Sequence, residues 1–510
     1  MKKLILLFLF MFLFIANYSF AQFTDPVWTT VGGNSKRNGL TDAGYLFGPL
    51  SKSYAADNSI WGMQIFSYGS KFVTSRYVSL SPLKAVVNAF SYASVPNSGP
   101  IWRFEKTGAV YIVMGFNDDK VYVRDFQQNG NDSIFALNAE NGNVIWRSNH
   151  TVERGIIWTA AFTSNGDLIL PGSGTKKIMR INHMTGDSVW TNDRIIPNTG
   201  AECLCVNGNT VYAFQGGLTT PKTLIAIDAN TGQTKYSSPE LPGDGDQEIP
   251  FSISANGIIY IIRDGGLMYS LIDDGTSLSI RWSRPVLHPV GTYSQIGISY
   301  DSSVYIPYGR KIYRLSYVNG TALDSSIEIA SSGTINPRFL IGAVGELYVG
   351  NGASVPSEGR YYRFNANLQS ISVNLPFPYN YYSGPAFGNT NLVPTILMTG
   401  SGTQIYTRYS VISSMNPISS IAPNNFNLYQ NFPNPFNPET LIKFDIASAQ
   451  FVQLKIYDAM GKETETLVNG QLNSGTYQVK WNASKYSSGI YYSKLIAGNF
   501  ISTKKMMYIK

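Results

Sequence analysis

A segment of about 45 residues recurs along the chain, and its period constrains the fold more than any other feature. In each copy, a β-rich run is followed by a turn that contains glycine and then by a second run with an aromatic residue. These aromatic positions are spaced by 44, 44, 46 and 46 residues, and they are Trp102, Trp146, Trp190, Tyr236 and Trp282. A period of this length with four strands per copy is typical of β-propeller blades.

The clearest copy runs from Ile134 to Trp146, where apolar side chains alternate with more polar ones as in a half-buried strand. Asn141-Gly142 predicts a two-residue hairpin turn in which both residues adopt positive φ. Related segments are Met179–Trp190 and Leu224–Tyr236. The repeat therefore consists of a strand, a turn and an outer strand that together form half of each blade.

The copies predict eight blades, with seven as the alternative because the first and last copies are weak. The fourth strands of two later copies are expected near Ile327–Ile329 and Ile371–Val373. The last copy, Ser383–Tyr409, has sequence for three strands only. We expect Leu50–Ala56 to add its outer strand, because this pairing would close the ring and leave no open edge.

The composition agrees with an all-β protein and excludes some partners. Charged residues make up 14% of the chain, which has 47 glycines and 33 tyrosines, a profile of turn-rich β structure. The net charge of +7 lies mostly in the region after Asn424, which has nine lysines, no arginine and five acidic residues. The body therefore lacks the basic face that a nucleic-acid partner would need.

The first 21 residues have the pattern of a secretory signal peptide. Lys2 and Lys3 precede the apolar run Leu4–Ile15, and small residues follow at Ser19–Ala21. The apolar run is short for a bilayer span. After signal cleavage, we expect no transmembrane segment.

Candidate binding residues in the body all have a competing structural interpretation. Asp244, Asp246 and Glu248 are weak metal candidates, since alternate carboxylates in a glycine-containing loop can bind calcium, although a solvated turn has the same composition. Cys203 and Cys205 share one face of a strand, which favours core thiols over a metal site or a disulfide framework. The polar residues before the blade turns and the repeated tryptophans could bind a ligand, but turn capping and packing between blades explain them better; the polar residues are Asn138, Asn182 and Asp228.

The body resembles the quinoprotein-like β-propeller family over roughly residues 25 to 410. The resemblance rests on the motif Ala136–Trp146 and on Trp28, Gly32–Asn34 and Arg37–Gly39. The family includes dehydrogenases that bind pyrroloquinoline quinone and calcium beside a disulfide of adjacent cysteines. Here Leu204 separates the two cysteines, and no calcium ligand or catalytic base can be placed. The resemblance therefore implies the fold, while no cofactor and no catalytic residue are predicted.

A second domain is expected after a linker rich in Ser, Pro and Asn. Its strands are predicted from alternation, and about 85 residues of such strands suggest an immunoglobulin-like sandwich; the strands are Leu441–Ile446, Val452–Asp458, Tyr477–Trp481, Gly489–Ile496 and Lys504–Ile509. This tail resembles the type IX secretion C-terminal sorting domain. The residues that match the family motifs are Asn431, Pro433, Asn434, Pro435, Gly461, Gly475 and Gly489.

The two resemblances together define the expected organisation: signal peptide 1–21, propeller 22–412, linker 413–425 and sorting domain 426–510. They imply export through the periplasm by the type IX secretion machinery, to the medium or the outer cell surface. We expect the propeller to be a binding or adhesion module for a protein or glycan. The alternative is a secreted enzyme with its site on the propeller axis, such as a glycan hydrolase or lyase, or a quinone-dependent dehydrogenase.

Overall fold

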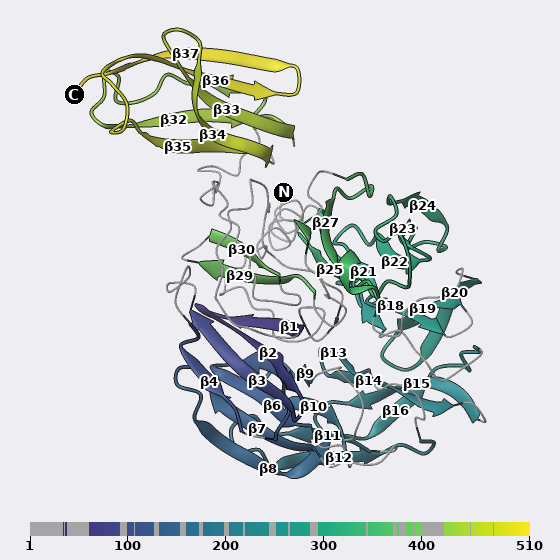
Figure 1. The fold of residues 1–510 in the computed structure, drawn as a ribbon. Coiled ribbons are helices and arrows are strands. Elements are labelled where there is room, and N and C mark those ends of the chain that lie inside the picture. The colour runs from purple at the N-terminus through teal and green to yellow at the C-terminus, as the bar shows by residue number, and fades with distance from the viewer. Residues whose placement is uncertain are drawn as a thin grey trace, which may run out of the picture.

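A computed structural model gives the arrangement of the chain (Figure 1). The described residues are 34, 36–37, 61–91, 99–106, 108–126, 132–152, 160–172, 177–197, 203–217, 220–243, 251–263, 266–285, 294–342, 345–370, 375–376, 384–390, 393–398, 423–448, 450–472 and 474–510. Apart from a short 3-10 helix, Pro356–Glu358, the regular elements among them are β-strands. The all-β prediction is therefore confirmed.

Between residues 61 and 398, the described strands form seven four-stranded antiparallel sheets and one two-stranded sheet. In each four-stranded sheet, strands that follow one another in sequence are neighbours. The first four sheets are β1 (Trp61–Tyr68), β2 (Lys71–Leu80), β3 (Leu83–Ser91), β4 (Trp102–Phe104); β5 (Tyr111–Asn117), β6 (Lys120–Asp125), β7 (Asp132–Asn138), β8 (Val144–Val152); β9 (Ala161–Phe162), β10 (Leu168–Pro171), β11 (Lys177–Ile181), β12 (Ser188–Asp193); and β13 (Cys205–Asn207), β14 (Thr210–Gly217), β15 (Thr220–Asp228), β16 (Thr234–Ser237). The others are β17 (Ser252–Ile253), β18 (Ile259–Arg263), β19 (Leu267–Asp273), β20 (Leu278–Pro285); β21 (Gly297–Ile298), β22 (Val304–Tyr308), β23 (Lys311–Leu315), β24 (Ala322–Ser325); β25 (Arg338–Ile341), β26 (Leu347–Gly350), β27 (Arg360–Phe364), β28 (Leu375–Pro376); and the pair β29 (Ala386–Thr390), β30 (Val393–Leu397).

The sheets are arranged radially, as blades of a β-propeller (Figure 1). The first strands of successive sheets contact one another, as in β9, β13, β17, β21 and β25, and the fourth strands β8, β12, β16, β20 and β24 lie at the periphery (Figure 1). The inner strands are more buried than the outer strands. The inner strand β5 is buried along nearly its whole length, whereas β12 alternates between buried and exposed residues because one of its faces meets solvent.

Apolar cores lie between neighbouring blades and close the ring. One cluster joins β1–β4 to β5–β8 through Val87, Trp102 and Val121, and equivalent clusters follow around the circle. The last cluster brings Phe72 of β2, Tyr348 of β26 and Phe387 of β29 together. The pair β29–β30 therefore completes the circle between the seventh sheet and the first.

Some strand positions differ from the predictions. The fourth strand of the sixth sheet is Ala322–Ser325 rather than Ile327–Ile329, because the turn before it is short and Ala322 already pairs with Leu315. The fourth strand of the seventh sheet is β28, and the predicted Ile371–Val373 lies outside the described residues. The expected closing strand Leu50–Ala56 lies outside the described residues, as does part of the last copy. The count of eight blades therefore stays a prediction.

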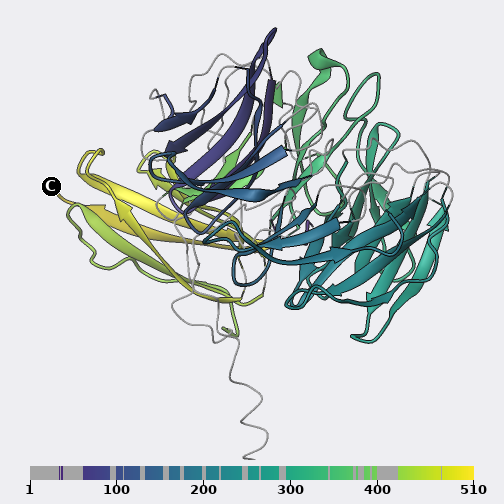
Figure 2. The same cartoon turned by 90° about the horizontal axis from the view of Figure 1, so that it is seen from below.

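The tail, drawn in lime to yellow in Figures 1 and 2, contains two antiparallel sheets. One has the order β31-β32-β35 and the other β34-β33-β36-β37. Four of the five predicted strands are found close to their expected positions, and the fifth begins four residues earlier than predicted. Two further strands, β31 and β34, were not predicted. The bounds are β31 (Asn427–Leu428), β32 (Glu439–Ile446), β33 (Gln450–Asp458), β34 (Glu463–Leu472), β35 (Gly475–Asn482), β36 (Gly489–Ala497) and β37 (Phe500–Tyr508).

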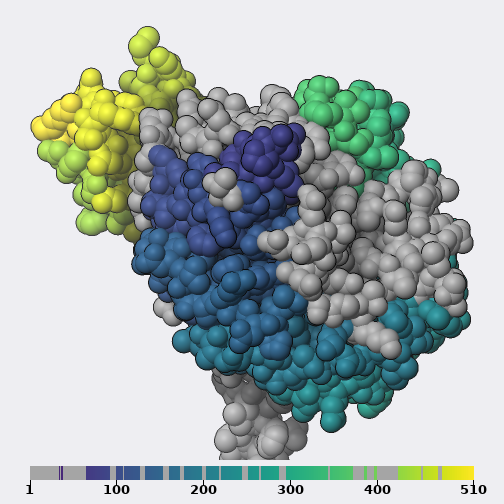
Figure 3. All heavy atoms as spheres, turned by 60° about the horizontal axis from the view of Figure 1, so that its bottom comes forward, coloured from purple at the N-terminus to yellow at the C-terminus, as the bar shows by residue number. Residues whose placement is uncertain are grey.

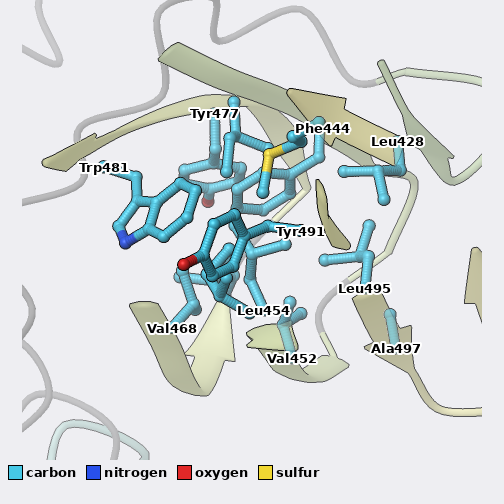
Figure 4. Packing of buried hydrophobic residues seen from close by; sticks show 14 of the residues in the cluster. Leu428, Phe444, Val452, Leu454, Val468, Tyr477, Trp481, Tyr491, Leu495 and Ala497 are labelled. Atoms are coloured by element: carbon cyan, nitrogen blue, oxygen red, sulfur yellow. The ribbon is translucent and has the colours of Figure 1, made fainter. Parts of the chain in front are cut away.

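The two tail sheets share one apolar core (Figure 4). Phe444 and Trp481 come from the first sheet, and Leu454, Tyr491 and Leu495 come from the second. All the members of this cluster lie in the tail, so the tail has a core of its own. The immunoglobulin-like description stays a prediction.

Within the described residues, no helix is long and apolar enough to cross a membrane. In the space-filling view, the colours run from purple through blue and teal to green around the body (Figure 3).

Candidate functional site

The repeated tryptophans join neighbouring blades, as the sequence predicts. The indole N–H of Trp146 donates a hydrogen bond to the carbonyl of His183 in the next sheet, at 3.0 Å. The ring also covers Gly186, where a Cβ atom would lie 2.6 Å from Trp146. Trp102, Trp190 and Trp282 make the equivalent hydrogen bonds to Ala139, Ala229 and Tyr317. These side chains are therefore part of the joints between blades.

The polar residues before the turns cap those turns. Asn138 Oδ1 accepts hydrogen bonds from the N–H groups of Glu140 and Asn141, at 2.8 and 3.2 Å. Asn182 and Asp228 do the same in their own blades. One detail of the prediction is wrong: Gly142 alone has positive φ, at 73°, while Asn141 does not. The cap stabilises a longer loop, residues 139–143, in which only Gly142 has a left-handed backbone.

An N-terminal segment that includes Arg37 lies against the inner strands. The residues that it contacts there are far from it in sequence. Arg37 is 2% exposed, and its Nε donates to the carbonyl of Leu204 at 2.7 Å. The carbonyl of Arg37 accepts hydrogen bonds from Ser252 Oγ at 2.9 Å and Gln295 Nε2 at 3.2 Å. The Arg37 residue thus connects the starts of three neighbouring sheets.

The same segment contacts Cys205, which like Cys203 is buried and forms no disulfide. The backbone N–H of Ile253 donates to the carbonyl of Lys36 at 2.9 Å, and Cys205 Sγ lies 3.9 Å from that carbonyl. Burial raises the pKa of the Cys205 thiol. Because a neutral thiol is a poor nucleophile and a poor metal ligand, the placement agrees with core thiols.

A buried charged cluster links the second, third and fourth sheets. Asp167 accepts a hydrogen bond from His183 Nδ1 at 2.7 Å and from Arg180 Nε at 2.8 Å. Arg180 also donates to the carbonyl of Ala229 in the fourth sheet at 2.7 Å. Burial alone would raise the pKa of Asp167, but the hydrogen bonds from His183 and Arg180 outweigh it and hold the pKa below its usual value.

The Asp167–His183 contact has the geometry that orients an imidazole in hydrolase triads. The other contacts of this cluster are structural. The carbonyl of His183 accepts a hydrogen bond from Trp146, and Arg180 donates a hydrogen bond to the next blade. Among the described side chains, no group of three or more His, Cys, Asp or Glu is placed to bind a metal ion. The weak metal candidates Asp244, Asp246 and Glu248 lie outside the described residues.

In the tail, the matched motif residues form a hydrogen-bonded segment around Asn431. Asn431 is 2% exposed, and its Nδ2 donates to the carbonyl of Pro433 at 3.0 Å and to Thr440 Oγ1 at 2.9 Å. Thr440 Oγ1 also donates to the carbonyl of Pro433 at 2.8 Å. The peptide bonds before Pro433 and Pro435 are cis. The amide of Asn431 thus fixes a compact bend at the start of the domain.

This bend is attached to the last strand of the chain. Asn434 Oδ1 accepts a hydrogen bond from the N–H of Met507 at 2.8 Å, and its Nδ2 donates to the carbonyl of Lys505 at 3.2 Å. Phe436 pairs with Tyr508 and stacks on it at 5.2 Å. The motif at the beginning of the domain therefore binds its C-terminal strand β37.

The three matched glycines lie outside the bend, one in a turn and two at the starts of strands. Gly461 has φ +80° in the turn between β33 and β34, a conformation that favours glycine. Gly475 begins β35 opposite Ile446, and Gly489 begins β36 opposite Tyr508. The sequence did not indicate Thr440 or Gln430 as members of the segment. Gln430 donates to the carbonyl of Lys505 at 2.7 Å, a contact between residues 75 positions apart.

Comparisons with known families agree with both parts of the chain. Residues 130–296 match the family described as outer membrane protein assembly factor BamB. Residues 430–510 match the secretion system C-terminal sorting domain. Among curated proteins, none matches this chain.

Several solved structures are similar to the chain at low sequence identity. The quinohemoprotein alcohol dehydrogenase ADHIIG from Pseudomonas putida HK5 has a TM-score of 0.54 at 12% identity, over 81% of this chain and 84% of that one. BamB from Moraxella catarrhalis has a TM-score of 0.47 at 14% identity, over 71% and 99%. PorZ, an essential surface component of the type IX secretion system of Porphyromonas gingivalis, has a TM-score of 0.41 at 14% identity, over 91% and 61%.

The dehydrogenase similarity supports the propeller fold and carries no activity with it. The sorting-domain match covers the whole segment from the Asn431 bend to Lys510, and it indicates export by the type IX system to the cell surface or the extracellular space. The chain therefore combines a PQQ-like repeat β-propeller with a type IX secretion C-terminal sorting domain.

Proposed function

We propose that the tail is the signal by which the type IX machinery moves this propeller from the periplasm to the cell surface, where the propeller binds a protein or glycan. The observation that carries the export part is the contact between the Asn431–Phe436 bend and β37. It joins the two ends of the matched segment into one folded unit. A machinery that reads this unit would recognise a cargo only after its C-terminus has been synthesised and folded.

The binding role is supported by how the conspicuous residues of the body are used. The repeated tryptophans and turn residues hold blades together. Ser252 and Gln295, which lie near the starts of two inner strands, both donate hydrogen bonds to the carbonyl of Arg37. A propeller whose blades are joined in this way is suited to presenting its loops to a partner. The glycan or protein would be found by screening the mature full-length chain against both classes.

Export is tested by removing the tail or loosening its bend. Deletion of residues 426–510 should leave the propeller in the periplasm, as measured by cell fractionation and by protease accessibility on intact cells. Asn431→Ala should reduce surface display, because it leaves the carbonyl of Pro433 and Thr440 without their amide partner. Asn499→Ala, in the exposed turn before β37, is the matched control and should be exported normally. Surface display of the deleted protein at the parent level would refute the export role.

A further inference from the structure

One face of the tail is exposed and combines apolar, aromatic and basic side chains. Along β37, Met506 and Tyr508 point into the core, whereas Ile501 and Met507 are 60% and 40% exposed. The same alternation leaves Tyr457 of β33 and Tyr492 of β36 half-exposed. We call this surface the outer tail face, and its defining residues are Tyr457, Tyr492, Lys494, Ile501, Lys505 and Met507.

The strand register places these side chains side by side. Tyr457 lies opposite Tyr492 on the neighbouring strand, and Tyr492 lies opposite Lys505. Ile501 of β37 lies opposite Ile496 of β36, farther along the same pair of strands. Directly opposed side chains on adjacent strands have Cβ atoms about 5 Å apart. The face is therefore continuous across three strands.

The outer tail face carries positive charge that the tail does not neutralise. Four side-chain carboxylates of the tail have partners away from this face: Glu439 with Lys480, Glu465 with Lys485, Asp445 with Tyr429 and Thr476, and Asp458 with its own turn. Glu463 lies beside the face, opposite Tyr457, and pairs there with Lys455, a third lysine that lies opposite Lys494. Among the described residues, neither Lys494 nor Lys505 has a carboxylate partner. Two cations thus border a half-exposed tyrosine pair and exposed aliphatic side chains.

We propose that the outer tail face docks onto an anionic lipid membrane. Tyrosines favour the headgroup level of a bilayer, and exposed Ile and Met side chains can enter the boundary beneath it. Lysines add attraction to anionic headgroups without needing a fixed geometry. Protein interfaces, in contrast, are enriched in arginine and depleted in lysine, and the tail contains nine lysines and no arginine. This inference goes beyond the proposed export and does not depend on it.

The test measures binding of the purified mature full-length chain to vesicles by flotation. One vesicle type contains phosphatidylcholine alone, and the other contains equal parts of phosphatidylcholine and phosphatidylglycerol. The parent should bind the anionic vesicles and lose this binding as salt is raised. Each lysine near an anionic surface should contribute about 5-fold to the partition coefficient, so Lys494→Gln/Lys505→Gln should lower it by about 25-fold.

Matched variants separate this face from net charge. Lys480→Gln/Lys485→Gln removes the same charge from lysines that are 58% and 62% exposed and lie off the face; its partition coefficient should stay within about 2-fold of the parent. Ile501→Ser/Met507→Ser keeps the charge and should also weaken binding. Thermal unfolding of each variant shows whether the tail remains folded.

Three results would overturn the proposal: no binding of the parent to anionic vesicles, equal binding to both vesicle types, or equal loss in the two lysine pairs. If vesicles fail to bind while Lys494→Gln/Lys505→Gln blocks export in cells, the face is a protein-docking surface instead. Normal export together with lost vesicle binding would leave the proposed export role intact. The two hypotheses therefore fail in different experiments.

Discussion

At the scale of single residues, the buried charges of the propeller hold separate blades together. Arg37 joins an N-terminal segment to the starts of three sheets, and Asp167 with Arg180 joins the third sheet to the fourth. A buried charge is tolerated only where hydrogen bonds replace its lost hydration. Both sites meet this condition with partners from different sheets, so their removal should weaken the ring rather than one blade.

The first prediction concerns Arg37→Met, which keeps the length of the side chain and removes its donors. The carbonyl of Leu204 would lose its partner inside the ring, so we expect the free energy of unfolding to fall by about 2–3 kcal/mol. Lys36→Met is the control, because the ring contacts of Lys36 come mainly from its backbone; its cost should be below about 0.5 kcal/mol. Urea unfolding measures both, and equal effects would contradict the role of the guanidinium.

The second prediction concerns the pH dependence that Asp167 supplies. Its lowered pKa means that its stabilisation is complete above the pKa of an unfolded aspartate, about 3.9, and is lost as the pH falls through the lower folded value. Asp167→Asn leaves Arg180 without its carboxylate and should cost about 3–5 kcal/mol at neutral pH.

The difference between Asp167→Asn and the parent should shrink when unfolding is repeated at about pH 3. The exposed Asp187 has no ion pair among the described residues, so Asp187→Asn should follow the parent at both pH values. A constant difference for Asp167→Asn across this range would show that the carboxylate charge does not contribute.

At the scale of elements, the joint between blades is the unit that the sequence repeats. Each complete joint combines a tryptophan, the carbonyl that accepts its N–H, and a glycine covered by the ring. Tyr236 replaces the tryptophan in the fourth blade, and its hydroxyl donates to the side chain of Asp273 at 2.5 Å instead. The aromatic spacing could predict these joints because one repeat carries the ring and the next carries its acceptor.

The third prediction tests one joint with Gly186→Ala. Both this variant and the control Gly275→Ala place alanine at positive φ, which costs about 1–2 kcal/mol. Only at Gly186 would the new Cβ also meet Trp146, at 2.6 Å, whereas nothing lies within 4 Å at Gly275. Displacing the indole should add about 1–3 kcal/mol. Equal melting temperatures for the two variants would show that the tryptophan contact is not limiting.

The sequence could not place elements whose residue types suit a turn as well as a strand. Strand β34 contains charged and hydroxyl residues at its start and Asn469-Gly470 near its end, which resemble a turn. It is a strand because β33 offers it a long antiparallel partner, from Gln450 to Tyr457. Pairing with a neighbour overrides the weak local preference. Likewise, the hydrogen bonds that the Asn138 side chain accepts determine the conformation of its turn.

At the scale of the whole molecule, the chain contains two bodies with separate cores. The tail cluster includes Phe436 and Trp481 and no propeller residue, while the clusters of the propeller contain no tail residue. Sequence motifs could identify both bodies. They could not identify the Arg37 contacts, because Leu204 and Gln295 lie 167 and 258 positions away in sequence, and no local pattern encodes a contact at that distance.

The last prediction follows from the separate cores: the two bodies should unfold in two distinguishable transitions. Phe436→Ala removes a ring that is 3% exposed and contacts Trp481 and Tyr508, so it should destabilise the tail by about 3–5 kcal/mol. Gly186→Ala should shift only the propeller transition. Calorimetry of the mature chain, with hydrogen exchange to assign each transition, measures both shifts. If either substitution moved both transitions equally, the bodies would be one cooperative unit, and the export machinery would then receive a tail whose stability depends on its cargo.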